Sequence, residues 1–247
     1  MAFKYETHLH TSDSSACGRA CGPDYLAGYK ELGYDGIFVT DHFYLGNTCV
    51  SRELPWPEWV EQYCQSYYKT KEAGDQIGIK VFFGWESTYG TGEDFLIYGL
   101  SPEWLKDHPE IISLNQEEQY SLVHKEGGLV VQAHPFRERG YMSEIHLHPH
   151  HCDAWEVANA GNMPYMDKRA YKYAKAHGMR MTCGSDIHTT ERLKEGMVYP
   201  IITDEPLNSE QDYVRLILSG KGFQPEIPQD ILDCELQEPG LPVYWHF

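Results

Sequence analysis

Two histidines near the start of the chain, His8 and His10, are the first residues whose spacing could support chemistry. They lie in the run ETHLHTSD at positions 6–13. Because alternate side chains of a β-strand point to the same face, an extended backbone here directs both imidazoles at one point. Such a pair can bind a transition metal, but it also occurs on ordinary solvent-facing strands. The remainder of the chain must decide between the two.

Further candidate ligands stand where later predicted strands end. They are His42 after 35–40, Glu86 after 80–84, His134 after 129–133, and Asp186 with His188 after 180–183. In a barrel of parallel strands all carboxyl ends face one side, so these side chains should converge there. Imidazoles suit transition metals, and a carboxylate such as Glu86 can bridge two ions. The pattern predicts a centre with several metal ions, in which Asp41 holds the ring of His42 in place.

The elements that position these ligands follow from the hydrophobic pattern. Apolar runs of strand length alternate with amphipathic stretches of helix length, as in repeated βα units. Further strands are predicted over 3–8, 93–100 and 153–157, and helices over 23–32, 58–74, 115–125, 163–177 and 211–218. With 247 residues and 41% hydrophobic content, the chain fits one α/β barrel domain over 1–247, with an irregular tail from about residue 225.

The net charge of −17 bears on which partners the chain can bind. A groove for nucleic acid needs clustered Lys and Arg, so we expect no nucleic-acid partner. A small phosphorylated substrate is compatible with the charge if metal ions supply the positive field locally. No apolar stretch is long enough for a membrane span, and the start of the chain lacks the apolar region of an export signal. The sequence indicates no oligomeric state.

Cysteine usage and a histidine tract complete the inventory of reactive side chains. Seven cysteines, an odd number without an export signal, fit reduced thiols and a cytoplasmic location. Cys17 and Cys21 are interpreted as loop thiols, since their spacing matches no zinc-binding pair. The tract HLHPHH at 146–151 precedes a predicted strand, away from the other ligands, and is interpreted as structural. Glu156 and Asn159 end that strand and could contact a ligand or the substrate.

Five motifs together resemble those of the PHP (polymerase and histidinol phosphatase) family. They are HLHT at 8–11, TDH at 40–42, GWE at 84–86, AHPF at 133–136 and GSDIH at 184–188. They occur in the family's order and span about residues 5–200. The resemblance implies a distorted (β/α)7 TIM-like barrel of PHP type, two or three divalent metal ions (Zn, Mn or Fe), and phosphoesterase activity.

The resemblance also implies how the ligands are shared among the ions. It assigns His8, His10, Glu86 and Asp186 to one ion, Glu86 and His134 to a second, and His42 and His188 to a third. Two positions depart from the family pattern. Members commonly show H-x-H-x-x-x-S-D-G, whereas the nearest acid here is Asp13, and Asp94 aligns with a histidine that many members carry after the bridging glutamate. We expect Asp13 and Asp94 to act as metal ligands in their place.

The leading hypothesis is hydrolysis of a small phosphorylated metabolite by metal-activated water, without a protein nucleophile. The expected catalytic residues are Glu86, Asp186 and His42: Glu86 sets the metal spacing, and Asp186 or a nearby histidine moves the proton. Arg137 and, more weakly, Arg19 could hold the substrate phosphate in a bidentate fork. The alternatives are hydrolysis of an amide or carboxylic ester, and a non-catalytic metal-binding PHP domain.

Overall fold

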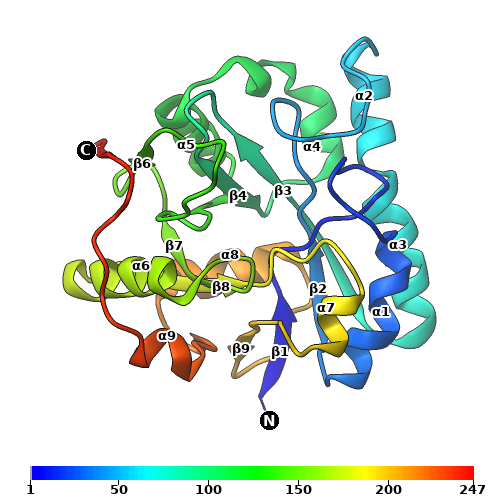
Figure 1. Ribbon diagram of the computed structural model, residues 1–247. Coiled ribbons are helices and arrows are strands. Elements are labelled where there is room, and N and C mark those ends of the chain that lie inside the picture. Colours follow the sequence, from blue (N-terminus) through cyan, green and yellow to red (C-terminus); the bar gives the residue numbers. More distant parts are fainter. Residues whose placement is uncertain (1) are drawn as a thin grey trace.

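The alternating pattern folds into a curved sheet wrapped by helices in the computed structural model, which describes residues 2–247 (Figure 1). Within these residues the sheet has nine strands in the order β10-β9-β1-β2-β3-β4-β5-β7-β8. Seven of them form the barrel: β1 (Phe3–Glu6), β2 (Gly36–Val39), β3 (Lys80–Thr88), β4 (Asp94–Tyr98), β5 (Leu129–Gln132), β7 (Ala154–Asn159) and β8 (Arg180–Gly184). The segments that follow β1 and β8 pair in parallel through Leu9 and Ile187, which nearly closes the sheet. The predicted distorted (β/α)7 barrel is confirmed.

The distortion comes from β4, which is antiparallel to both β3 and β5. Only residues 89–93 connect β3 to β4, and a parallel crossover needs a dozen or more residues. The hairpin therefore returns at once, and Asp94 pairs with Thr88. This arrangement brings the start of β4, rather than its end, to the rim that carries the ligands.

The remaining strands and helices cover the barrel (Figure 1). The helices are α1 (Gly22–Glu31), α2 (Trp56–Tyr63), α3 (Gln65–Ile77), α4 (Pro102–Asp107), η1 (Pro109–Ser113), α5 (Gln116–Lys125), α6 (Pro164–His177), α7 (Glu191–Lys194), α8 (Glu210–Ser219) and α9 (Gln229–Asp233). The single helix predicted over 58–74 is two helices. The Tyr63 carbonyl accepts a hydrogen bond from the Ser14 hydroxyl (2.7 Å), which interrupts the helical ladder there. Strand β9 (Ile201–Thr203) pairs with the free edge of β1, and β10 (Phe223–Pro225) pairs with β9.

Buried tyrosines fix the first strand and its continuation. The Tyr98 hydroxyl donates to the Thr7 carbonyl (2.7 Å), and the Tyr25 hydroxyl donates to the His10 carbonyl (3.2 Å). Both rings are fully buried, so the phenol bodies pack in the core while their hydroxyls satisfy backbone groups. The backbone around His8 and His10 is therefore held by packing as well as by strand pairing.

The tail beyond residue 225 is more regular than expected. It contains α9 and β11 (Val243–Trp245), which pairs in parallel with β6 (Ile145–Leu147). The Trp245 ring lies 4.4 Å from that of Tyr173, measured between centroids, and this aromatic contact anchors the strand. Prolines alone suggested an irregular tail, but they lie outside β11. Among residues 2–247, no helix combines the length and the apolar character that a membrane crossing requires.

Candidate metal centre

The candidate ligands from distant parts of the sequence meet at one end of the barrel. His8 Nε2 lies 3.2 Å from Glu86 Oε1, and His134 Nε2 lies 3.1 Å from the same oxygen. His10 Nε2 lies 3.1 Å from Asp186 Oδ1. These five side chains are at most 6% exposed, so the predicted convergence of strand ends is what the structure shows.

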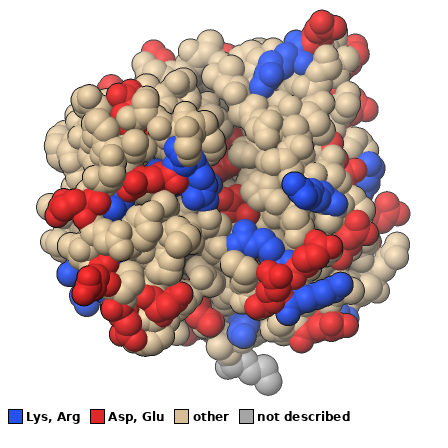
Figure 2. Space-filling model, viewed as in Figure 1, with Lys and Arg blue, Asp and Glu red and all other residues tan. Residues whose placement is uncertain are grey.

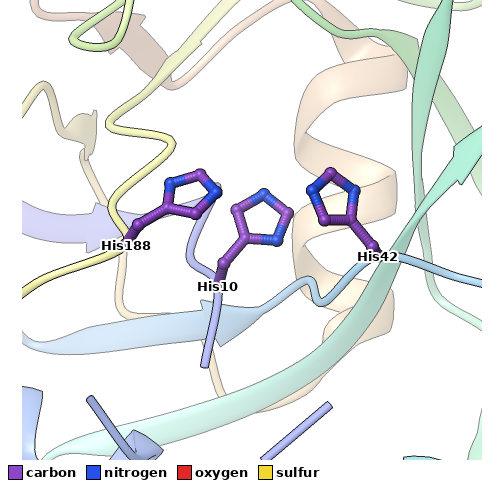
Figure 3. Close-up of side chains that lie close together, drawn as sticks. All are labelled: His10, His42 and His188. Atoms are coloured by element: carbon purple, nitrogen blue, oxygen red, sulfur yellow. The ribbon is translucent and has the colours of Figure 1, made fainter. Parts of the chain in front are cut away.

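Four sets of three side chains have ligand atoms within 4.8 Å of one another. The sets are His8, His10 and Glu86; His8, His134 and Asp186; Glu86, Asp94 and His134; and His10, His42 and His188. Figure 3 shows the last set as a row with His10 in the middle. Its ring centroid lies 4.3 Å from that of His42 and 4.5 Å from that of His188. Asp94 belongs to the third of these sets, beside Glu86 and His134.

Several polar atoms of this cluster are buried without a hydrogen-bond partner, and these test whether metal ions fit. They include Glu86 Oε2, His42 Nδ1 and Asp94 Oδ1. The first two lie 2.7 Å apart, yet their orientation does not make a hydrogen bond. Leaving such atoms unsatisfied is costly, and a shared cation would satisfy them. Five imidazoles interleaved with carboxylates therefore fit divalent metal ions.

Charge interactions within the cluster oppose the effect of burial. Burial raises the pKa of Glu86, but the adjacent His42 and His8 hold it well below its usual range. Burial lowers the pKa of His8, but Glu156, Asp186 and Glu86 outweigh it and raise that pKa well above its usual value. Asp94 behaves differently, because burial and the Glu86 charge together raise its pKa to about 7. The clustered carboxylates thus create a strong local demand for positive charge.

Glu156, within β7, orients one of the candidate ligands. Its Oε1 lies 2.9 Å from His8 Nδ1, and its Oε2 accepts hydrogen bonds from the His134 backbone N–H (3.0 Å) and the Asn159 amide (2.7 Å). A carboxylate at Nδ1 fixes the imidazole so that Nε2 faces the cluster. The sequence placed Glu156 on the correct side of the sheet but did not specify this contact.

Asp41 does not perform the role expected of it. Its carboxylate accepts hydrogen bonds from the Thr11 backbone N–H (2.6 Å), the Thr11 hydroxyl (2.8 Å) and the Ser15 hydroxyl (2.6 Å). Ser15 Oγ in turn accepts from the His42 backbone N–H (3.0 Å). Asp41 therefore orders the loop after His10, and the expected bond from Asp41 to the His42 ring is replaced by this network.

A second buried carboxylate, Glu6, was missed by sequence reasoning. It accepts hydrogen bonds from the backbone N–H groups of His8 (2.8 Å) and Ser185 (2.9 Å) and from the Tyr29 hydroxyl (2.9 Å). It thereby links β1 to the segment that follows β8. A glutamate at the buried end of a strand is the only signal that the sequence offered.

Two of the predicted site residues are not brought to the cluster. Asp13 lies in the turn after His10 and pairs with Lys69 of α3 (2.8 Å), outside the four sets. Arg19 is exposed and does not line the cleft described below, although its backbone N–H donates to the His188 carbonyl (2.8 Å). The turn points the Asp13 side chain toward α3, which the sequence pattern alone could not indicate.

Two of the candidate ligand residues adopt strained backbone conformations. His134 has φ 30° and Asp186 has φ 49°, and within residues 2–247 they are the non-glycine residues with positive φ. This region costs on the order of 1–3 kcal/mol for a residue with a Cβ, and such costs concentrate at functional sites. Both side chains consequently leave their strand ends in the direction of the cluster.

A cleft of about 540 Å³ opens above the cluster. His42, Asp94, Asp186 and His188 line it together with Arg137, Arg139, Arg192, Tyr141 and Cys17. Arg137 Nη2 donates to Asp186 Oδ2 (2.5 Å) and Asn159 Oδ1 (2.9 Å), so a buried network fixes its guanidinium. Figure 2 shows basic side chains around the hollow of this face, with acidic atoms in its depth. An acidic protein thus presents a locally basic rim, to which Arg139 and Arg192 were not predicted to contribute.

Comparison with solved structures shows the fold. The chain is similar to a two-domain protein from Bacteroides vulgatus described as containing a predicted PHP-like metal-dependent phosphoesterase, with TM-score 0.68 and 19% identity over 91% of this chain. It spans 64% of that protein's length. It is also similar to a Bifidobacterium adolescentis protein for which metal-dependent phosphoesterase activity is inferred (TM-score 0.55, 17% identity, 87% of this chain and 96% of that chain). The PHP-type fold implied by the sequence motifs is confirmed. Neither a family model nor a curated protein matches the sequence.

A third similar structure corrects one expectation. The lesion-specific endonuclease EndoQ of Pyrococcus furiosus aligns with TM-score 0.59 and 15% identity over 91% of this chain, which spans 58% of its length. Endonuclease Q has also been seen in complex with a 27-mer duplex substrate, in a structure that aligns over 91% of this chain with 12% identity, 58% coverage of its own length and TM-score 0.53. Our exclusion of nucleic acid from the net charge was therefore wrong. Local charge at the cleft, not the total over the chain, governs such binding.

Proposed function

We propose that this chain is a metal-dependent phosphoesterase of PHP type that hydrolyses small phosphorylated molecules. The observation that carries the proposal is the convergence of five imidazoles with Glu86, Asp94 and Asp186 beneath a cleft rimmed by arginines. A volume of about 540 Å³ suits a small ligand. The fold shared with metal-dependent phosphoesterases supports the same reaction class.

The proposed ligands are the members of the four sets: His8, His10, His42, Glu86, Asp94, His134, Asp186 and His188. Divalent ions held there would supply Lewis acidity and activate water for in-line attack on the phosphorus. Zn, Mn and Fe are the candidates, with two or three ions in the centre. Glu86 is the central member, because its two oxygens contact His8, His134 and His42.

The side chains of the cleft have separate proposed roles. Arg137 positions the phosphate, since it faces the cleft while Asp186, Asn159 and Asn162 hold its guanidinium. We assign proton transfer to Asp186 and His42 because both line the same cleft. Buried Glu156 keeps His8 Nε2 directed at Glu86 throughout.

A substrate panel tests the proposal. Purified protein, supplied with Mn²⁺, Zn²⁺ or Fe²⁺ in turn, is assayed on p-nitrophenyl phosphate, bis(p-nitrophenyl) phosphate, an abasic-site oligonucleotide duplex and a p-nitroanilide. We expect metal-dependent hydrolysis of the monoester above all others. Preference for the duplex would replace the small-molecule substrate class with nucleic acid. Bound metal without turnover of any phosphoester would overturn the proposed function.

A further inference from the structure

A tight turn in the loop after His10 presents the thiol of Cys17 to the cleft. The Gly18 backbone N–H donates to the Ser15 carbonyl (3.0 Å), which places Cys17 at the third position of a four-residue turn. A Cβ on residue 18 would overlap the Thr11 backbone, so only glycine permits this close approach. The backbone therefore fixes Cys17 in place.

The same turn is attached to the two strand ends that carry His42 and His188. Ser15 Oγ accepts from the His42 backbone N–H (3.0 Å), and the Arg19 backbone N–H donates to the His188 carbonyl (2.8 Å). Cys17, between these anchors, lines the cleft with both histidines. A thiolate binds transition metals together with imidazoles, as in the mixed Cys and His sites of zinc proteins.

The metal position beside His42 and His188 can take one further protein ligand, because His10 is shared between two sets. His10 belongs to two of the four sets, but its Nε2 is 3.1 Å from both His8 Nε2 and Asp186 Oδ1. Its other nitrogen, Nδ1, lies 3.2 Å from Ser15 Oγ. If His10 serves the ion nearest His8 and Asp186, the position beside His42 and His188 keeps two imidazoles.

We propose that Cys17 is the third protein ligand of a metal ion held by His42 and His188. The inference rests on the metal centre of the proposed function. On binding, the S–H proton passes to solvent and the thiolate sulfur forms the metal bond. One thiolate and two imidazoles leave a tetrahedral ion one open position, as catalytic zinc sites do. A soft thiolate also favours Zn²⁺ or Co²⁺ over Mn²⁺ at this position.

Cobalt spectroscopy tests the assignment without reference to turnover. The wild-type chain, depleted of metal and titrated with Co²⁺, should develop a near-ultraviolet thiolate-to-cobalt charge-transfer band. Cys17→Ser should lose that band and one equivalent of tightly bound Co²⁺. Cys49→Ser is the matched control, because Cys49 is an exposed thiol in the loop that pairs with this turn, and it should keep both. Cys17→His should restore the equivalent without the band.

A second measurement covers the case in which Cys17→Ser folds poorly. Iodoacetamide labelling of the wild-type chain, mapped by mass spectrometry, should show Cys17 protected by Zn²⁺ and Cys49 labelled equally with and without it. An unchanged band in Cys17→Ser, or equal labelling of Cys17 with and without Zn²⁺, would overturn the proposal. A chain that shows the band and protection but hydrolyses no phosphoester would keep Cys17 as a ligand and refute the proposed function alone.

Discussion

Two groups of histidines in this molecule differ in what surrounds them. The mouth cluster, at the barrel opening, comprises His8, His10, His42, His134 and His188. The edge cluster, where β6 meets the C-terminal strand, comprises His146, His148 and His246. Imidazoles contact one another in both clusters, but in the mouth cluster Glu86 and Asp186 each also join two or more of them, whereas the carboxylates of the edge cluster each contact one. His146 Nδ1 lies 2.8 Å from His246 Nε2, and the rings of His148 and His246 stack 4.3 Å apart.

The difference teaches that position in the fold matters more than local density of histidine. Two members of the edge cluster, His146 and His148, belong to the conspicuous tract at 146–151, yet in residues 2–247 none of its members joins a metal-type set of three. Its nearest carboxylates, Glu93 and Glu144, each contact a single imidazole, at 3.3 Å and 2.9 Å. The mouth cluster draws on residues far apart in sequence that strand ends bring together.

The largest effect that separates the clusters is expected from Glu86→Gln. Losing the charge that links three mouth-cluster imidazoles should lower kcat/KM on a phosphomonoester by at least about 1000-fold, the equivalent of roughly 4 kcal/mol of transition-state stabilisation. Glu93→Gln, the matching change at the edge cluster, should leave the rate within a factor of about 2. Comparable losses in both variants would erase the distinction, and full activity in Glu86→Gln would refute the assigned role.

A smaller effect is expected from Glu156→Gln. The amide retains the size of the side chain but no longer fixes His8 with a charge, so metal affinity should fall about 10–100-fold. Competition with a fluorescent chelator measures this change. Metal affinity equal to that of the wild type would show that Glu156 serves only the backbone of His134 and the amide of Asn159.

Removing the metal should lower thermal stability through the mouth cluster and not through the edge cluster. An ion present at about 100 times its Kd adds about 2.7 kcal/mol to the folded state. For a chain of this size a chelator should therefore lower Tm by roughly 5–10 °C. His246→Ala should lower Tm slightly but leave the chelator-induced shift unchanged. A shift that disappears in His246→Ala would place a metal ion at the edge cluster instead.

The smallest effect concerns acidification of the edge cluster. Burial and the neighbouring His148 and His146 lower the pKa of His246, and Glu93 opposes them only in part. The folded state thus binds fewer protons than the unfolded state, so this contribution is present above the unfolded pKa of about 6.5 and is lost as pH falls through it. The opening constant of residues 243–246, obtained from hydrogen exchange after division by the intrinsic base-catalysed rate, should rise a few-fold between pH 7 and pH 5. His246→Gln should flatten that response, and an equal rise in the variant would exclude the histidine.

The convergence of the mouth-cluster side chains was predictable because strand ends in a barrel converge whatever the loops do. His134 follows the buried run at 129–133 and Asp186 follows the strand predicted over 180–183, so both positions are visible in the sequence. The position of the Asp13 side chain was not predictable, because it depends on the orientation of the turn after His10. That turn directs the carboxylate to Lys69 of α3. Glu156 reaches His8 across 148 positions, a pairing that no local pattern encodes. Cys17 was interpreted as a loop thiol. Its position in the cleft likewise depends on a turn, which the Gly18 backbone N–H closes.

The strained φ angles of His134 and Asp186 carry a consequence for laboratory evolution. Glycine occupies the left-handed region without a steric cost, so replacing either residue by glycine should relieve strain while it removes a ligand. A library selected only for resistance to heat in the presence of a chelator would therefore be expected to discard these two side chains. Selection that also demands turnover should retain them. The residues found at these two positions would then show how each selection balanced stability against activity.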